Sequence, residues 1–195
     1  MNELTKIAAA NQQRAREVIR DSGLEAAWRS VGAEPNLVGS LRTGLLMTHR
    51  DIDFHIYSSP LRVADSFAAM ARLAENNRIR SITFNNLLDA PDQCLEWHAW
   101  YADADDQLWQ IDMIHMPKGS AYDGYFERVA DRIAAVLTDR TRETILRLKY
   151  ETPEAEKIMG IEYYQAVLRD GVGTYAEFEA WRAAHPVTGI LEWMP

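Results

Sequence analysis

Apolar side chains recur near the start of the chain at the spacing of one helix face. Ala8, Ala15 and Val18 follow a period of about 3.6 residues, which predicts an amphipathic helix over residues 3–20. The same period over residues 63–74 predicts a second helix.

Between and after these helices the pattern changes to that of strands. Residues 51–57, DIDFHIY, alternate polar and apolar side chains, which is the period of a strand. The short apolar run 36–38 reads as a strand that ends in a turn at Gly39-Ser40. Three further strands are predicted, and the polar turn 103–106 joins the last two into a hairpin. Their ranges are 79–88, 94–102 and 107–116.

The remainder of the chain has helical patterning. Apolar positions over 122–137 predict a helix, with Ser120 as its N-cap. Thr152 followed by proline is typical of a helix start. Thr174 opens a Thr-x-x-Glu capping box, and the helix that it begins should end at His185-Pro186.

These elements predict an α/β (α+β) fold with two parts. Residues 1–117 should form a short, twisted mixed sheet of about five strands, with helices mainly on one face. Residues 118–195 should form a helical bundle that packs on this core, because no flexible linker separates the two parts.

Composition narrows the choice of partners. The net charge of −8 argues against nucleic acid as a partner. No apolar run has the length of a membrane span and no secretion signal is evident, so we expect no membrane association. The single cysteine, Cys94, excludes an intrachain disulfide and fits a cytoplasmic protein. Oligomerisation stays open.

Acidic side chains form the most informative group. Asp51 and Asp53 are two positions apart on a strand, so their carboxylates share a face and repel each other unless a cation lies between them. Asp112 is flanked by Ile111 and Met113 on a later strand and needs a partner for the same reason. Oxygen ligands of this kind suit Mg²⁺ or Mn²⁺.

A candidate phosphate site precedes these acids. The turn at Gly39 and Ser40 offers backbone N–H groups and a hydroxyl, and glycine allows a phosphate to approach the backbone. Arg42 and Arg50 would offset phosphate charge.

Gly-Ser, then Asp-x-Asp, then an aspartate between apolar residues resembles the pattern of the polymerase-β-like nucleotidyltransferase superfamily. The motif falls on Gly39, Ser40, Asp51, Asp53 and Asp112. The run from Thr48 to Asp53 is also similar to the Asp-x-Asp region of aminoglycoside and lincosamide nucleotidyltransferases.

The resemblance implies metal-dependent transfer of a nucleoside monophosphate from a nucleoside triphosphate (NTP), with release of pyrophosphate. Asp51, Asp53 and Asp112 would be both the metal ligands and the catalytic acids. Because the chain is acidic, we expect the acceptor to be a hydroxyl of a small molecule.

Residues near the acids suggest where that acceptor would bind. Glu96, His98 and Trp100 should share one strand face and, with His55, are candidates for the acceptor pocket. The competing interpretation is core packing for the β-hairpin residues and a structural role for His55. Arg147 and Lys149 in the helical part are candidates for contact with the triphosphate; the alternative is a solvated helix face.

Other functions stay open at this point. The only role of Asp51 and Asp53 could be to keep an edge strand from pairing with other chains, and Asp112 could form a buried ion pair with an arginine. A non-catalytic nucleotide-binding module, a toxin–antitoxin or regulatory partner, an enzyme that nucleotidylates proteins, and a metal-dependent hydrolase are the rival functions.

Overall fold

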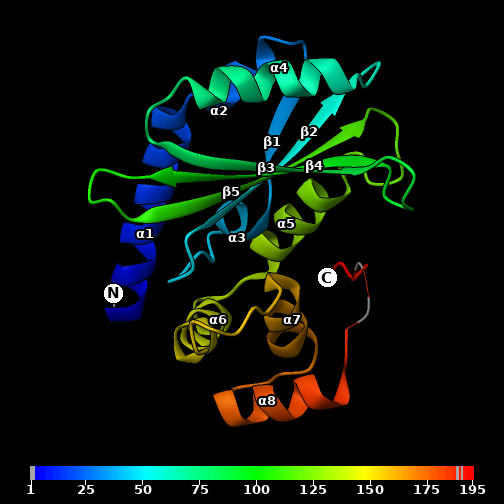
Figure 1. Ribbon diagram of the computed structural model, residues 1–195. Coiled ribbons are helices and arrows are strands. Elements are labelled where there is room, and N and C mark those ends of the chain that lie inside the picture. The colour runs from blue at the N-terminus through cyan, green and yellow to red at the C-terminus, as the bar shows by residue number, and fades with distance from the viewer. Residues whose placement is uncertain (1–2, 188, 190) are drawn as a thin grey trace.

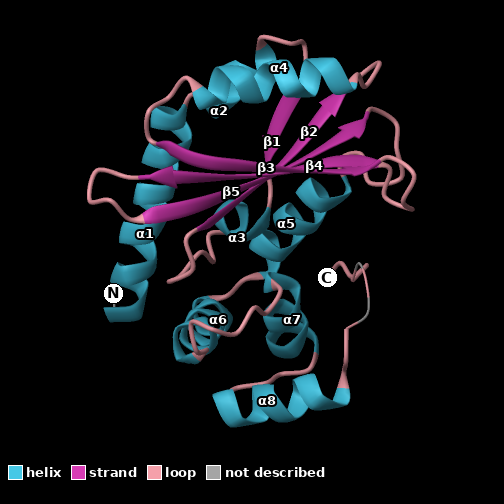
Figure 2. Cartoon of the chain, in the orientation of Figure 1, coloured by secondary structure: helices cyan, strands magenta, loops and turns pink. Residues whose placement is uncertain are grey.

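The computed structural model describes residues 3–187, 189 and 191–195 (Figures 1 and 2). In chain order the elements are α1 (Glu3–Ser22), α2 (Leu24–Arg29), β1 (Glu34–Leu37), α3 (Gly39–Thr43), β2 (Asp51–Ser58), α4 (Val63–Ala74), β3 (Ile79–Leu87), β4 (Cys94–Ala102), β5 (Leu108–Pro117), α5 (Tyr125–Val136), α6 (Asp139–Glu151), α7 (Gly160–Tyr164), a π-helical turn η1 (Gln165–Arg169) and α8 (Tyr175–Ala184).

The strands form one mixed sheet in the order β1-β2-β5-β4-β3. Only the central pair, β2 and β5, is parallel; the other neighbours are antiparallel. The parallel register sets Asp53 beside Asp112. Two segments that are distant in the sequence therefore meet in the middle of the sheet.

One face of the sheet carries the main core. Alternate residues of β2, β4 and β5 point into it, among them Phe54, Trp97 and Ile111, and all three are nearly fully buried. They pack against α2 and α4, including the fully buried Trp28. Figure 1 shows α2 and α4 over this face, with α3 and α5 on the opposite side. The residues between the buried ones face the opposite side, where the acids lie.

A second core joins the helical part to the rest of the chain. It combines Ala8 of α1, and Leu45 and Met47 after α3, with residues of α5 to α8 such as Phe178. The two parts expected from the sequence are thus in contact. The boundary at residue 117 stays a prediction.

The strands, the hairpin at 103–106 and the helix at 63–74 are confirmed, and the mixed sheet agrees with the expected fold class. The capping box at Thr174 is also present. Two helix starts were wrong. Gly124, with a left-handed backbone, precedes α5 in place of Ser120. Thr152 ends α6, and its hydroxyl donates to the carbonyl of Leu148 at 2.8 Å.

The helices α2 and α6 were not expected as separate elements. The helix α6 begins at Thr138, where a capping box with Thr141 marks its start. Within the described ranges, no helix has both the length and the apolar character needed to cross a membrane.

Candidate active site

Three carboxylates meet on the open face of the sheet. Asp51 and Asp53 project from β2 on the same side, and Asp112 lies beside Asp53 on β5. Among the described residues, neither Asp51 nor Asp53 has an ion pair or a side-chain hydrogen bond. The carboxylate of Asp112 contacts His98 and Gln110, and among the described residues it forms no ion pair with an arginine.

This arrangement raises the pKa of Asp53 to about 7. The main cause is the removal of its carboxylate from water, followed by repulsion from Asp51 and Asp112; Lys149 acts in the opposite direction. A divalent cation at this place would stabilise the charged form. The donors are all carboxylate oxygens, which suits Mg²⁺ or Mn²⁺.

The acids do not complete a metal site by themselves. In the described part of the chain, no three His, Cys, Asp or Glu side chains are arranged as a ready set of metal ligands. Mg²⁺ commonly takes one or two carboxylates together with water and substrate phosphates. The residues present fit that mode of binding, in which the substrate supplies the missing ligands.

Gly39 lies directly against these acids. Its φ is +65°, and a Cβ at this position would collide with the carboxylate of Asp53. The backbone N–H of Val38 donates to the carbonyl of Asp53 at 2.9 Å and ties the turn to β2. Ser40 follows in the same turn and lines the adjoining cavity. Only glycine brings the backbone this close to the acids.

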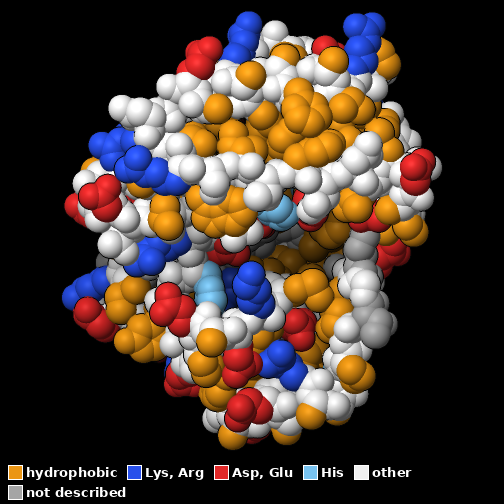
Figure 3. Space-filling model, in the orientation of Figure 1, with side chains coloured by type: hydrophobic (Ala, Val, Ile, Leu, Met, Phe, Trp, Pro, Cys, Tyr) orange, Lys and Arg blue, Asp and Glu red, His pale blue; other side chains and the backbone are white. Residues whose placement is uncertain are grey.

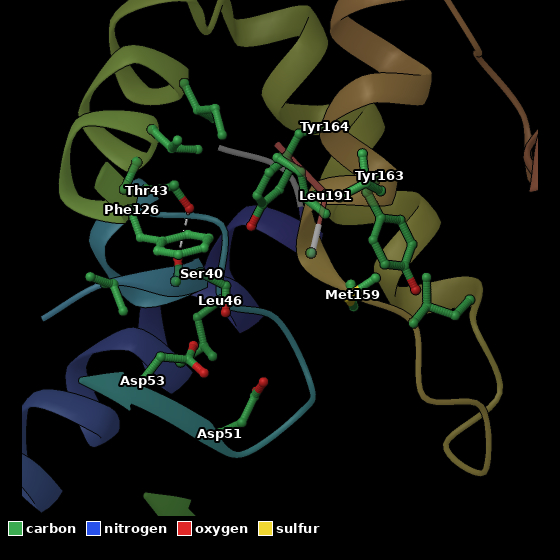
Figure 4. A pocket seen from close by; sticks show the side chains of 18 of the residues that line it. Ser40, Thr43, Leu46, Asp51, Asp53, Phe126, Met159, Tyr163, Tyr164 and Leu191 are labelled. Carbon is green, nitrogen blue, oxygen red and sulfur yellow. Dashed lines mark hydrogen bonds between the residues drawn. The ribbon is translucent and has the colours of Figure 1, made fainter. Parts of the chain in front are cut away.

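A cavity of about 500 Å³ opens in front of the turn and the acids. Its walls combine Gly39, Ser40, Asp51 and Asp53 with apolar side chains of α5 and of residues 158–164. Figure 4 shows the two aspartates on one side and Met159, Tyr163 and Tyr164 across from them. The surface is hollowed between the sheet and the helical part (Figure 3).

Lys149 supplies a cation to this cavity. Its side chain is largely buried, with Nζ 3.5 Å from the hydroxyl of Tyr164 and over the rings of Tyr163 and Tyr164. Among the described residues it has no carboxylate partner. The sequence carried a signal for this position: Lys149 lies four residues after Ile145, on the apolar face of α6.

The two arginines expected at a phosphate lie elsewhere. Arg42 is not part of the cavity wall; its guanidinium forms two hydrogen bonds of 2.8 Å with Asp131 of α5. This pair links α3 to α5. Arg50 is exposed and lines a second hollow.

The four candidates for an acceptor pocket share the face of the acids, but only His55 and Trp100 line either of the two hollows. His55 lines the main cavity, and burial lowers its pKa to about 4, so it is neutral at pH 7. Its ring packs edge-on against Phe126. Glu96, His98 and Trp100 lie on β4, on the side of Asp112.

Trp100 lines the second hollow, which has a volume of about 650 Å³. Gln110 and Arg50 lie in its wall together with Tyr150, half of whose surface is exposed. His49 lines both hollows, which places them next to each other. The carboxylate of Asp112 accepts a hydrogen bond from Gln110 and thus lies beside the second hollow.

No protein-family model and no curated protein matches the chain. The sheet and its flanking helices are similar in fold to solved poly(A) and poly(U) polymerases. Sequence identity to these structures is low, so the likeness concerns the fold.

Three of the similar structures illustrate the match. The poly(A) polymerase complex GLD-2–GLD-3 aligns with a TM-score of 0.53 and 13% identity, over 86% of this chain and 58% of the other. The Cid1 poly(U) polymerase with MgGTP gives 0.59 and 14%, over 86% and 55%. A cytoplasmic RNA terminal U-transferase gives 0.54 and 15%, over 85% and 53%. The chain spans little more than half the length of these proteins.

The raised pKa of Asp53 predicts a pH-dependent stability in the absence of divalent cations. Between its ordinary pKa of 3.8 and about 7, folded Asp53 holds a proton that the unfolded carboxyl releases. Stability therefore falls as the pH rises through this window. In EDTA, the Tm of the wild type relative to Asp53→Asn should decrease from about pH 4 to pH 7, and Mg²⁺ should reduce the decrease. A constant difference in Tm would contradict the electrostatic account.

Proposed function

We propose that the protein is a Mg²⁺-dependent nucleotidyltransferase that moves a nucleoside monophosphate from an NTP to a hydroxyl of a small-molecule acceptor. The observation that carries the proposal is the meeting of three carboxylates, Asp51, Asp53 and Asp112, on one sheet face. The glycine turn packs against them, and a cavity with a buried lysine opens in front.

In this proposal the triphosphate occupies the main cavity. Gly39 allows its turn to lie against the carboxylate of Asp53, and the hydroxyl of Ser40, in the cavity wall, is available to a phosphate. Lys149 offsets the charge of the phosphates from across the cavity. The apolar and aromatic wall beyond it, including Tyr163 and Tyr164, is suited to the base and sugar.

The reaction then needs an acceptor oxygen on the opposite side of the α-phosphorus. That oxygen forms a bond to the α-phosphorus while the bond to the leaving pyrophosphate breaks, and Asp112 accepts the proton of the hydroxyl. Asp51, Asp53 and Asp112 would hold the metal, which would neutralise part of the phosphate charge. The contribution of the chain is mainly to position the two substrates.

The second hollow is the site that we assign to the acceptor. It adjoins Asp112 through Gln110, and Trp100 and Tyr150 offer it aromatic surface. Its charged lining residues, Arg50 and Glu154, cancel each other. A polyanion would find little attraction there, in keeping with the net charge of −8. The similar polymerases act on RNA, so RNA is the alternative that the experiments must include.

The first test is NTP binding, because it needs no knowledge of the acceptor. Each of the four NTPs should be titrated by calorimetry with Mg²⁺ and again with EDTA. We expect metal-dependent binding of at least one NTP, and its loss in Asp53→Ala because that variant lacks one of the carboxylates that would hold the cation. Asp89→Ala, which removes an exposed acid beyond β3, is the control and should bind as the wild type does. Folded wild-type protein that binds no NTP would overturn the proposal.

A second test distinguishes the roles of the basic side chains Lys149 and Arg42. Lys149→Met should weaken Mg²⁺–NTP binding by about tenfold or more, the usual effect of losing a hydrogen bond to a charged group. Arg42→Met should leave NTP binding unchanged, because Arg42 is held by Asp131 outside the cavity. Equal losses in the two variants would show that Arg42 leaves Asp131 to contact the triphosphate.

The third test concerns the acceptor. Pyrophosphate release should be screened with hydroxylated aromatic small molecules and, in parallel, with short oligoribonucleotides. For any acceptor found, Trp100→Ala should raise its KM roughly tenfold, the effect of one lost stacking contact, without changing NTP affinity. Release that occurs only with oligoribonucleotides would replace the small-molecule assignment. A KM unaffected by Trp100→Ala would remove the second hollow from the acceptor site.

A further inference from the structure

The two carboxylate oxygens of Asp112 are in different environments. Oδ1 accepts hydrogen bonds from His98 Nδ1 at 2.5 Å and from Gln110 Nε2 at 2.8 Å. No described residue donates to Oδ2. A carboxylate can rotate about its Cβ–Cγ bond, so two donors on one oxygen select the orientation of the other.

His98 is held in place from both sides. It lies directly opposite Asp112 in the antiparallel pairing of β4 and β5. On the other side of the ring, Nε2 is 3.5 Å from Glu96 Oε1, and the second oxygen of Glu96 accepts a hydrogen bond of 2.7 Å from Asn85. The chain of contacts from Asn85 through Glu96 and His98 thus ends at Asp112.

We propose that His98 is a positioning residue that binds Oδ1 of Asp112 and thereby keeps Oδ2 directed to the cation and the acceptor hydroxyl. The proposal rests on the proposed function, since it assigns a role beside the same site. His98 itself touches neither substrate in this scheme. It acts through Asp112, as hydrogen-bonding partners of metal-binding carboxylates generally do.

Exposure argues against a purely structural role. The side chains of His98 and Asp112 are 23% and 24% exposed, so water could satisfy both if they were apart. Burial therefore does not force this pair to form, whereas a fixed orientation of the Asp112 carboxylate depends on it. Gln110 alone would hold Oδ1 through a single, longer hydrogen bond from its own strand.

The test measures metal binding rather than turnover. Mn²⁺ binding to the full chain is followed by electron paramagnetic resonance in the presence of an NTP analogue with a non-hydrolysable α,β bridge. Asp112→Asn identifies the Mn²⁺ binding that depends on Asp112. His98→Leu should lower the affinity of that binding by roughly tenfold to a hundredfold. At saturating Mn²⁺, the affinity for the analogue should stay close to that of the wild type, and so should the Tm.

Two further variants distinguish a positioning role of His98 from the general effect of removing a histidine side chain. His98→Asn keeps a donor near the place of Nδ1 and should restore most of the Mn²⁺ affinity. His185→Leu removes a histidine whose Nδ1 contacts the carbonyl of Trp181, away from the acids, and should have no effect.

Four outcomes would overturn the proposal. Unchanged Mn²⁺ affinity in His98→Leu would do so, as would an Asp112→Asn variant that binds Mn²⁺ like the wild type. An equal loss in His98→Leu and His98→Asn, accompanied by a lower Tm, would assign a structural role. Wild-type protein that binds neither the analogue nor Mn²⁺ would overturn the proposed function as well, and so the two failures can be told apart.

Discussion

Mutual repulsion of Asp51, Asp53 and Asp112 is the constraint on which the site depends. The parallel pairing of β2 with β5 brings the carboxylates together, and the pKa of Asp53 rises first because its carboxylate is removed from water and then because the other two carboxylates are close. The buried core on the opposite face of the sheet holds this arrangement. The protein thus uses packing energy from one face to maintain an unfavourable charge cluster on the other, a cost that a bound cation would offset.

The two sides of the carboxylate cluster have different surroundings, and each side suits a different substrate. The main cavity has the glycine turn, a buried lysine and aromatic walls, whereas the second hollow has balanced charge and a tryptophan at its edge. Asp112 lies next to Asp53 on one side and is hydrogen-bonded to Gln110 in the wall of the second hollow; His98 also binds it and in turn contacts Glu96 on β4. A group-transfer enzyme requires such a division, because its two substrates must approach the same atom from opposite sides.

Much of this site could be predicted from the sequence, since alternation along a strand decides which side chains share a face. That rule identified the common face of the acids and of His98 and Trp100. It could not supply contacts that depend on tertiary packing, such as the pairing of Arg42 with α5. Local signals can also be ambiguous. A proline such as the one after Thr152 is common both just beyond the end of a helix and at the first position of one, and here it follows the end of α6.

The central parallel pair also has a consequence for how the protein folds. Asp53 and Asp112 meet only after β5 has been inserted between β2 and β4, and the intervening chain includes a helix and two strands. Closing such a long loop is slow compared with forming helices and hairpins. The β4–β5 hairpin can form early, but the acidic cluster has no counterpart in any local fragment. Ligand binding would therefore report the last stage of assembly, and a nascent chain would acquire it only once β5 had been synthesised.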